Sequence, residues 1–170
     1  MDKTIVEPDI AAPLDVYRDV VRPEWIDNNG HMNMGYYLVV FDFATDAFFP
    51  WVGLDRAHRE RHGVTTFCLE AHVTYQRELH AGDGLRFTTR LLGHDAKRIH
   101  YVHEMYHAAQ GYLAATNELM SLHVSRETRR ATPMAHAVLE RLARIQAVHD
   151  TLPRPAHIGR RIGLDAGRAT

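Results

Sequence analysis

The sequence predicts a single α+β domain in which a long helix lies on one face of an antiparallel sheet. The chain has 170 residues, 45% of them hydrophobic and 24% charged, which is the balance of one soluble domain with one core. One apolar helical stripe is followed by four strand-like segments and a second helix. This order favours an α+β layer over alternating parallel units. We expect the domain to span residues 1–150 and a tail to span 151–170.

The first part of the domain is expected to hold one strand and the long helix. Residues 15–22 alternate imperfectly between apolar and polar side chains, and Pro23 ends the run as it would end a strand. Asn33 is a suitable N-cap for the helix that follows, and Pro50 and Gly53 mark its end. Its apolar stripe recurs at spacings of four and three: Tyr37, Phe41, Ala44, Phe48.

The second part of the domain is expected to form two hairpins and a terminal helix. Strands are predicted over 65–79, 85–92, 98–108 and 112–124, because these segments are rich in β-branched and aromatic residues. Turn sequences at 81–84 and 109–111 join them in pairs. Pro133 opens a helix that runs to about Val148, and the Pro-, Gly- and Arg-rich tail from Leu152 onward is expected to be loosely held.

Charge and hydropathy argue against nucleic acid and membrane partners. Twenty basic side chains against 21 acidic ones leave a net charge of -1, so nothing drives the chain toward polyanions. The N-terminus lacks the pattern of a secretory signal. The most apolar run, 38–49, is interrupted by Asp42 and Asp46 and is shorter than the roughly 20 residues that span a bilayer. We therefore expect a cytoplasmic protein.

The strongest functional signal lies in residues 25–37, where polar side chains directly precede the apolar helix. A helix start offers backbone N–H groups without intrahelical acceptors and a partial positive charge, so it can stabilise an oxygen that becomes anionic. Asp27 lies a few residues upstream, accompanied by Asn29 and His31. A carboxylate beside such donors suits hydrolysis of an activated acyl group. The alternative is a plain turn, since Asp, Asn and Gly favour turns for backbone reasons alone.

Two other motifs invite different chemistry. His103-Glu104-Met105-Tyr106-His107 fits the zinc-protease formula H-E-x-x-H, which binds zinc only on a helix. Here the segment alternates like a strand, which would hold the two His roughly 13 Å apart, so we expect no metal site. The single Cys68 lies in an apolar strand segment, and we expect it to be a small buried hydrophobe rather than a nucleophile.

The loop motif resembles that of a known enzyme family. Asp27-x-Asn29-Gly30-His31-x-Asn33, followed by Tyr36-Tyr37 and an apolar helix, is similar to the signature of the hotdog-fold thioesterases of the 4-hydroxybenzoyl-CoA thioesterase type. It also resembles the Asp-x-Asn-x-His-x-Asn element of acyl-carrier-protein thioesterases. Residues 67–124 look most like the thioesterases of carnitine breakdown, which hydrolyse betainyl-CoA to glycine betaine and coenzyme A.

The resemblance implies a fold and a mechanism. The fold would be a roughly five-stranded antiparallel sheet wrapped around a long central helix, with a C-terminal helix added. The activity would be cofactor-free and metal-free hydrolysis of an acyl-CoA, in a homodimer or homotetramer with the site between subunits. Asp27 would be the catalytic carboxylate, as general base or as nucleophile, and Asn29 and His31 would assist it. The backbone N–H of Met34 would polarise the thioester carbonyl.

The resemblance also implies a set of substrate-binding residues. Aromatic side chains near the loop, with Asp42, Asp46 or Glu70, would form an acyl pocket for a quaternary ammonium group. Basic residues at strand ends could contact the phosphates of CoA. The candidate binding residues are Trp25, Tyr36, Tyr37, Glu70, Lys97 and Arg98, with Arg90 as a further possibility for phosphate. The alternatives are a thioesterase for another short or aromatic acyl-CoA, a non-catalytic acyl-CoA-binding domain, and a dehydratase of the same fold.

Overall fold

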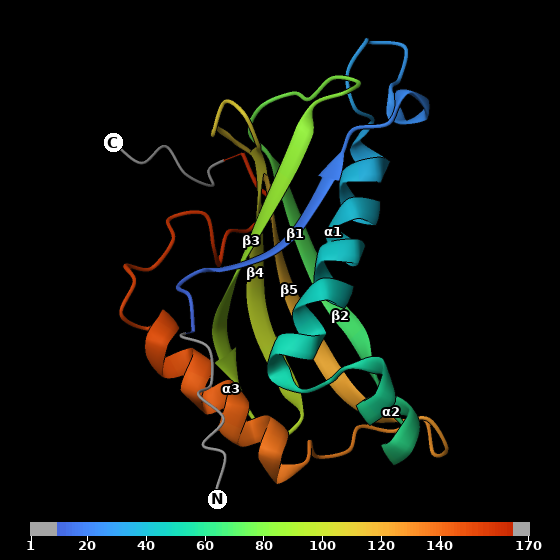
Figure 1. Cartoon of the computed structure of the whole chain (residues 1–170), viewed down its shortest axis with the longest axis vertical. Helices are drawn as coiled ribbons and strands as arrows, with labels where there is room; N and C mark the ends of the chain where they lie inside the picture. The colour runs from blue at the N-terminus through green and yellow to red at the C-terminus, as the bar shows by residue number, and fades with distance from the viewer. Residues whose placement is uncertain (1–9, 165–170) are drawn as a thin grey trace, which may run out of the picture.

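The computed structural model, which describes residues 10–164, is built on one five-stranded antiparallel sheet (Figure 1). Its strand order is β1-β3-β4-β5-β2. The strands are β1 (Leu14–Val20), β2 (Val64–Tyr75), β3 (Gly84–His94), β4 (Arg98–His107) and β5 (Leu113–Ser125). Helix α1 (Met34–Phe48) runs along one face of the sheet. The predicted class, the five strands and the long helix are confirmed.

Helix α1 begins where the sequence predicts. The Asn33 side chain accepts a hydrogen bond from the Gly35 N–H at 2.9 Å, which satisfies one of the free donors of the first turn. The apolar stripe faces the sheet, because burial of these side chains is what holds an amphipathic helix in place. The buried side chains of α1 are Tyr37, Val40, Phe41, Ala44, Thr45 and Phe48.

Two predicted boundaries differ from the structure, and one helix was not predicted. Strand β2 ends at Tyr75 rather than near Leu79, because the Gln76 and Arg77 N–H groups both bond to Ala114 O and the chain leaves the ladder there. Helix α3 (His136–His149) begins three residues after Pro133. A short helix, α2 (Arg56–His62), was not predicted, since it buries no residue and so carries no apolar stripe.

The expectation that Cys68 is buried is wrong. Cys68 is exposed, because β2 is an edge strand whose ladder to β5 shifts register between Cys68 and Glu70. Burial of part of the side chain still raises the pKa of the Cys68 thiol, with a smaller opposing effect from its hydrogen bond to Glu70 O. A raised pKa leaves little thiolate at neutral pH, which agrees with an unreactive thiol.

The segment with the H-E-x-x-H formula is strand β4, as the alternation predicts. His103 is fully buried beneath α1, where its Nε2 lies 3.0 Å from Thr45 Oγ1 and its Nδ1 lies 2.6 Å from Thr89 Oγ1. His107 instead lies 3.4 Å from a carboxylate oxygen of Asp83. Within residues 10–164, no group of three His, Cys, Asp or Glu side chains could hold a metal ion.

Part of the C-terminal tail is held against the sheet, which differs from the predicted loose segment. Arg90 of β3 donates hydrogen bonds to the carbonyls of Leu152 and Pro153. Glu118 of β5 accepts a bond from the Gly159 N–H at 2.7 Å. These contacts come from residues more than 40 positions away, so no local pattern predicts them. The segment 151–160 therefore covers part of the sheet face opposite α1 (Figure 1).

No single helix in the described part of the chain is both long and apolar enough to cross a membrane. Residues 34–52 and 56–62 pass that test only when taken together as a pair bent by 71°.

Candidate active site

The loop before α1 is closed and anchored. The Asp27 N–H bonds to His31 O at 3.0 Å, and the Gly30 N–H bonds back to Asp27 O at 3.0 Å. Gly30 has φ +83°, a left-handed conformation that suits glycine in a tight turn. The Met32 N–H bonds to Leu79 O, which ties the loop to the segment between β2 and β3. The loop and the start of α1 lie together at one end of the molecule, the top in Figure 1.

The three candidate catalytic side chains all lie in this loop. The Asp27 carboxylate is partly buried, and its Oδ1 accepts a hydrogen bond from the Asn29 N–H at 2.8 Å. This contact uses the Asn29 backbone rather than its amide, and it also satisfies the plain-turn interpretation. His31 is partly buried, and its Nδ1 lies 3.5 Å from Met32 O, at the limit of a hydrogen bond.

The N–H of Met34 is open at the helix start. Asn33 Oδ1 takes the Gly35 N–H and Asn33 O takes the Tyr36 N–H, whereas the Met34 N–H has no acceptor among the described residues. Met34 is 67% exposed. A free donor at the positive end of a 15-residue helix is suited to stabilise a developing oxyanion.

The aromatic candidates near the loop build its support rather than the wall of a cavity. Trp25 is 5% exposed and stacks on Tyr36, with 5.7 Å between ring centroids. Tyr37 is also buried and meets Tyr75 edge to face at 5.2 Å. Burial raises the pKa of Tyr37 to about 12. These contacts fix the position of the loop against α1.

The structure separates three other candidates from the loop. Glu70 lies with His72, His100 and Glu118 on the face of the sheet opposite α1, so it does not line a pocket beneath the helix. Lys97 and Arg98 lie at the turn between β3 and β4, at the far end of the sheet from the Asp27 loop (Figure 1). Arg98 pairs there with Asp95 at 2.6 Å. Within one protomer these residues and Asp27 do not form one site.

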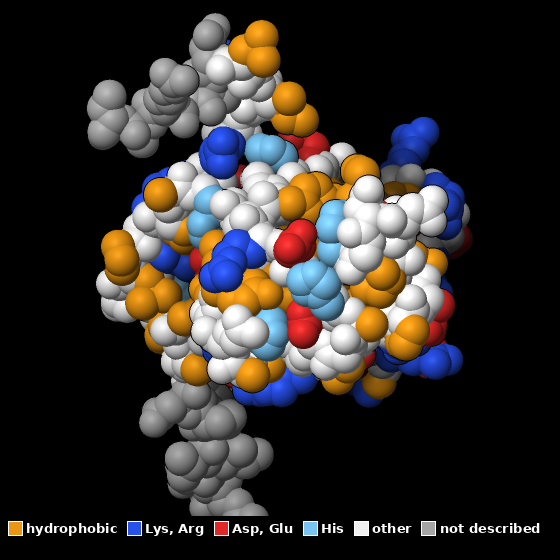
Figure 2. Space-filling view, turned by 90° about the horizontal axis from the view of Figure 1, so that it is seen from above, with side chains coloured by type: hydrophobic (Ala, Val, Ile, Leu, Met, Phe, Trp, Pro, Cys, Tyr) orange, Lys and Arg blue, Asp and Glu red, His pale blue; other side chains and the backbone are white. Residues whose placement is uncertain are grey.

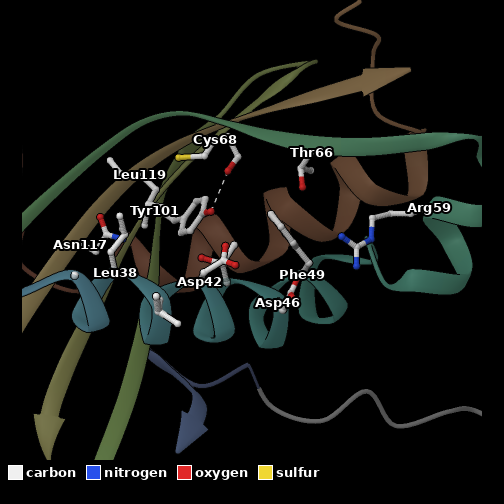
Figure 3. Close-up of a pocket in the computed structure, with 15 residues that line it drawn as sticks. Leu38, Asp42, Asp46, Phe49, Arg59, Thr66, Cys68, Tyr101, Asn117 and Leu119 are labelled. Carbon is white, nitrogen blue, oxygen red and sulfur yellow. Dashed lines mark hydrogen bonds between the residues drawn. The ribbon is translucent and has the colours of Figure 1, made fainter. Parts of the chain in front are cut away.

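A cavity of about 520 Å³ runs beside α1 from its first turn to α2. Figure 3 shows its walls: α1 on one side and strands β2, β4 and β5 on the other. Asn117 and Leu38 lie toward the start of α1, Asp42 points into the middle beside Tyr101, and Phe49 and Arg59 lie at the far end. Because the cavity reaches Gly35, it opens next to the free Met34 N–H.

The sheet side of this cavity carries polar groups that the sequence analysis missed. Tyr101 Oη and Ser121 Oγ are hydrogen-bonded at 2.9 Å. Asn117 is 1% exposed, yet both polar atoms of its amide have no hydrogen-bond partner among the described residues. The sequence does contain a sign of this polar group: Ala115, Asn117 and Leu119 occupy alternate positions of one strand, and a lone amide on such an apolar face is unusual.

The cavity contains two carboxylates whose negative charge is not balanced by an ion pair in the described chain. Asp42 has no ion-pair partner within 4 Å in the described chain, and neither has Asp46, one helical turn further. Burial raises the pKa of Asp42, and the nearby Asp46 carboxylate raises it further. On the loop end of the molecule, by contrast, hydrophobic, acidic, basic and His side chains are mixed (Figure 2).

A five-stranded antiparallel sheet laid along one long helix, with an acidic loop at the helix start, is the architecture of the hotdog class. Residues 21–142 match the model of the thioesterase-like superfamily, and the chain belongs to this family. A betainyl-CoA thioesterase of Pseudomonas aeruginosa is 41% identical over 151 residues, which are 89% of this chain and 95% of that protein. The family and this relative identify the chain as an acyl-CoA thioester hydrolase.

Two further relatives extend the comparison. An L-carnitine dehydrogenase/betainyl-CoA thioesterase of Rhizobium meliloti is 34% identical over 91% of this chain, which spans 31% of that longer protein. A hypothetical protein of Staphylococcus aureus, solved in complex with CoA, superposes with a TM-score of 0.83 and 29% identity. That match covers 93% of this chain and 99% of the other, so almost the whole fold is shared.

Proposed function

We propose that this protein hydrolyses betainyl-CoA to glycine betaine and coenzyme A. The observation that carries the proposal is the closed Asp27 loop, which leads directly into a helix whose first N–H, that of Met34, has no acceptor among residues 10–164. The choice of acyl group rests on the 41% identity to the betainyl-CoA thioesterase.

In the proposed reaction the thioester carbonyl oxygen accepts a hydrogen bond from Met34 N–H. Charge that develops on this oxygen is stabilised by the helix N-terminus. Asp27 then acts in one of two ways. As a general base it takes a proton from water, which attacks the carbonyl carbon; as a nucleophile it attacks that carbon and forms a mixed anhydride that water cleaves. Either way the C–S bond breaks, and CoA leaves as a thiolate that is then protonated.

The other loop residues have supporting roles in this proposal. The Asn29 N–H holds one carboxylate oxygen of Asp27 and leaves Oδ2 for the water or the carbonyl carbon. His31 of the same loop would supply an imidazole to the site. Lys97 and Arg98 could reach the phosphates of CoA only from a neighbouring subunit, because they lie at the opposite end of their own sheet.

We propose that the active form is at least a homodimer. Strand β2 is 12 residues long and lies at an edge of the sheet, where its outer backbone groups are open to pairing. Exposed apolar side chains continue from β2 onto α1, a feature of subunit interfaces. They are Phe67, Leu69 and Tyr75 on β2 and Met34, Leu38, Val39 and Phe43 on α1. A homotetramer is equally compatible with this surface. The proposed location is the cytoplasm, where acyl-CoA substrates are available.

The test is release of free thiol from betainyl-CoA by the wild type and by Asp27→Asn. We expect kcat of the variant to fall by about 10³-fold or more, with an unchanged unfolding midpoint and nearly unchanged CoA binding. Glu24→Gln is the matched control, because it removes an exposed carboxylate three residues away. Near-normal turnover by Asp27→Asn would contradict the role of Asp27. A wild type that hydrolyses other thioesters but not betainyl-CoA would contradict the substrate.

A further inference from the structure

We propose that Asp42 is the residue that selects a positively charged acyl group, which lies in the cavity beside α1 with its thioester at the helix start. This inference rests on the proposed function and deepens it. It assigns acyl recognition to the middle of the cavity rather than to the aromatic residues of the loop, because Trp25 and Tyr36 stack on each other.

The first argument is the uncompensated charge. Asp42 and Asp46 are four residues apart on one face of α1, where like charges repel each other. Among the described residues that line the cavity the one basic side chain is Arg59, which lies at the far end and forms no ion pair within 4 Å with either carboxylate. Such an arrangement destabilises the empty cavity and favours a bound cation, since a cation would relieve both the repulsion and the partial desolvation of Asp42.

The second argument is independent of charge. The amide of Asn117 is fully buried at the wall of the same cavity without a hydrogen-bond partner in the described chain. Leaving such a group unsatisfied is unfavourable, so a polar ligand atom that bonds to it would be stabilised. Figure 3 shows Asn117 toward the start of α1. The Asn117 amide therefore lies at the end of the cavity where the thioester would meet Met34 N–H.

The third argument is length. Eight residues separate Met34 from Asp42, a rise of about 12 Å along the helix, and helical side chains lean back toward the N-terminus by a fraction of a turn. Because helical N–H groups point toward the helix N-terminus, a carbonyl oxygen bonded to Met34 N–H lies before the first turn, and the short betainyl group then carries its ammonium back along α1 toward Asp42. Asp42 is about one helical turn, or roughly 5 Å, nearer to this ammonium than Asp46 is.

The walls around Asp42 also fit the three methyl groups of a trimethylammonium. Leu38 of α1 and Leu119 of β5 line the cavity on opposite sides of this position. Methyl groups on a quaternary nitrogen cannot donate hydrogen bonds, so a single carboxylate framed by apolar side chains satisfies both the charge and the surface of this group.

The test compares two substrates of the same shape. Betainyl-CoA and 3,3-dimethylbutanoyl-CoA differ only in a positively charged nitrogen against a neutral carbon. We expect Asp42→Asn to lower the ratio of their kcat/KM values by at least about tenfold. Asp46→Asn removes the same charge one turn further along the cavity, and we expect it to change the ratio by less than about threefold. Subunit assembly is followed by light scattering at one protein concentration.

Each outcome separates the inference from the proposed function. A wild type that prefers betainyl-CoA and an Asp42→Asn variant that keeps this preference would overturn the role of Asp42 alone. A wild type that does not hydrolyse betainyl-CoA would overturn both. Equal losses on both substrates, together with a smaller assembly, would show that Asp42 faces a basic group of a second copy, which also overturns the inference. A fallen ratio with unchanged assembly supports it.

Discussion

His103 of β4 bonds to Thr45 of α1 and to Thr89 of the neighbouring strand β3, and its burial makes the stability of this link between helix and sheet depend on pH. Thr45 Oγ1 donates its proton to Phe41 O at 3.0 Å, so it accepts from His103 Nε2–H. Nδ1 is then the acceptor of the Thr89 hydroxyl. Protonation would force a second N–H into this position. Burial lowers the pKa of His103 from 6.5 to about 3.

The size of the effect follows from linkage. Between pH 3 and pH 6.5 the unfolded chain binds a proton that the folded chain excludes, so the free energy of unfolding falls as the pH falls. One pKa unit corresponds to 1.36 kcal/mol. Relative to pH 7.5, the loss from His103 alone is about 1.3 kcal/mol at pH 5.5 and about 2.7 kcal/mol at pH 4.5. The full contribution is present above the unfolded pKa of 6.5.

The assay is urea unfolding of the wild type and His103→Gln at pH 7.5, 5.5 and 4.5, at one protein concentration. The variant should be less stable at pH 7.5, because it loses an imidazole that packs against Phe41 and Tyr101. The difference between the two proteins should narrow by about 1.3 kcal/mol at pH 5.5. His136→Gln, which changes an exposed His of α3, serves as the control. Parallel curves for wild type and His103→Gln would refute the reasoning.

Two further predictions concern the loop and the cavity. Gly30→Ala should lower the free energy of unfolding by about 1 kcal/mol, because φ +83° strains any residue with a side chain. The variant should also lower kcat more than it raises KM, because the strained turn moves Asp27. A stable variant with normal kcat would show that the turn is not needed for the chemistry. Asn117→Leu should unfold at the same or a higher urea concentration, because the substitution removes an unsatisfied buried amide. Its kcat/KM for betainyl-CoA should fall. Loss of stability together with unchanged activity would assign Asn117 a structural role.

Local patterns in the sequence predicted the elements well. The stripe of α1, the Asn33 cap and the strand nature of His103–His107 follow from spacing within a few residues, and the structure confirms them. Helix α2 was not predicted, because none of its seven residues is buried and it therefore has no apolar stripe. Cys68 was misjudged because an apolar neighbourhood does not reveal that a strand lies at an edge of the sheet.

The site was only partly predictable, because its parts come from different elements. The loop from Asp27 to Met34 is continuous in sequence, so a motif could indicate it. The cavity needs α1, β2, β4 and β5 together, and pairing between distant strands sets which side chains meet there. The same limit explains Glu70, whose β2 position follows a register shift and faces away from α1. The distance of Lys97 and Arg98 from Asp27 could not be predicted either, because it depends on which end of the sheet the Asp27 loop lies at.

Hydrogen bonds hold segment 151–160 against the sheet, from Gly159 to Glu118 and from Arg90 to residues 152 and 153. They restrict how subunits can pack against each other. Part of the sheet face opposite α1 is already covered by the chain's own segment 151–160, whereas the outer edge of β2 pairs with no other described strand. In a tetramer whose dimers meet through the sheet faces opposite α1, each neighbour would contact segment 151–160 as well as strands. The residues of this segment would then decide which copies of the dimer recognise each other.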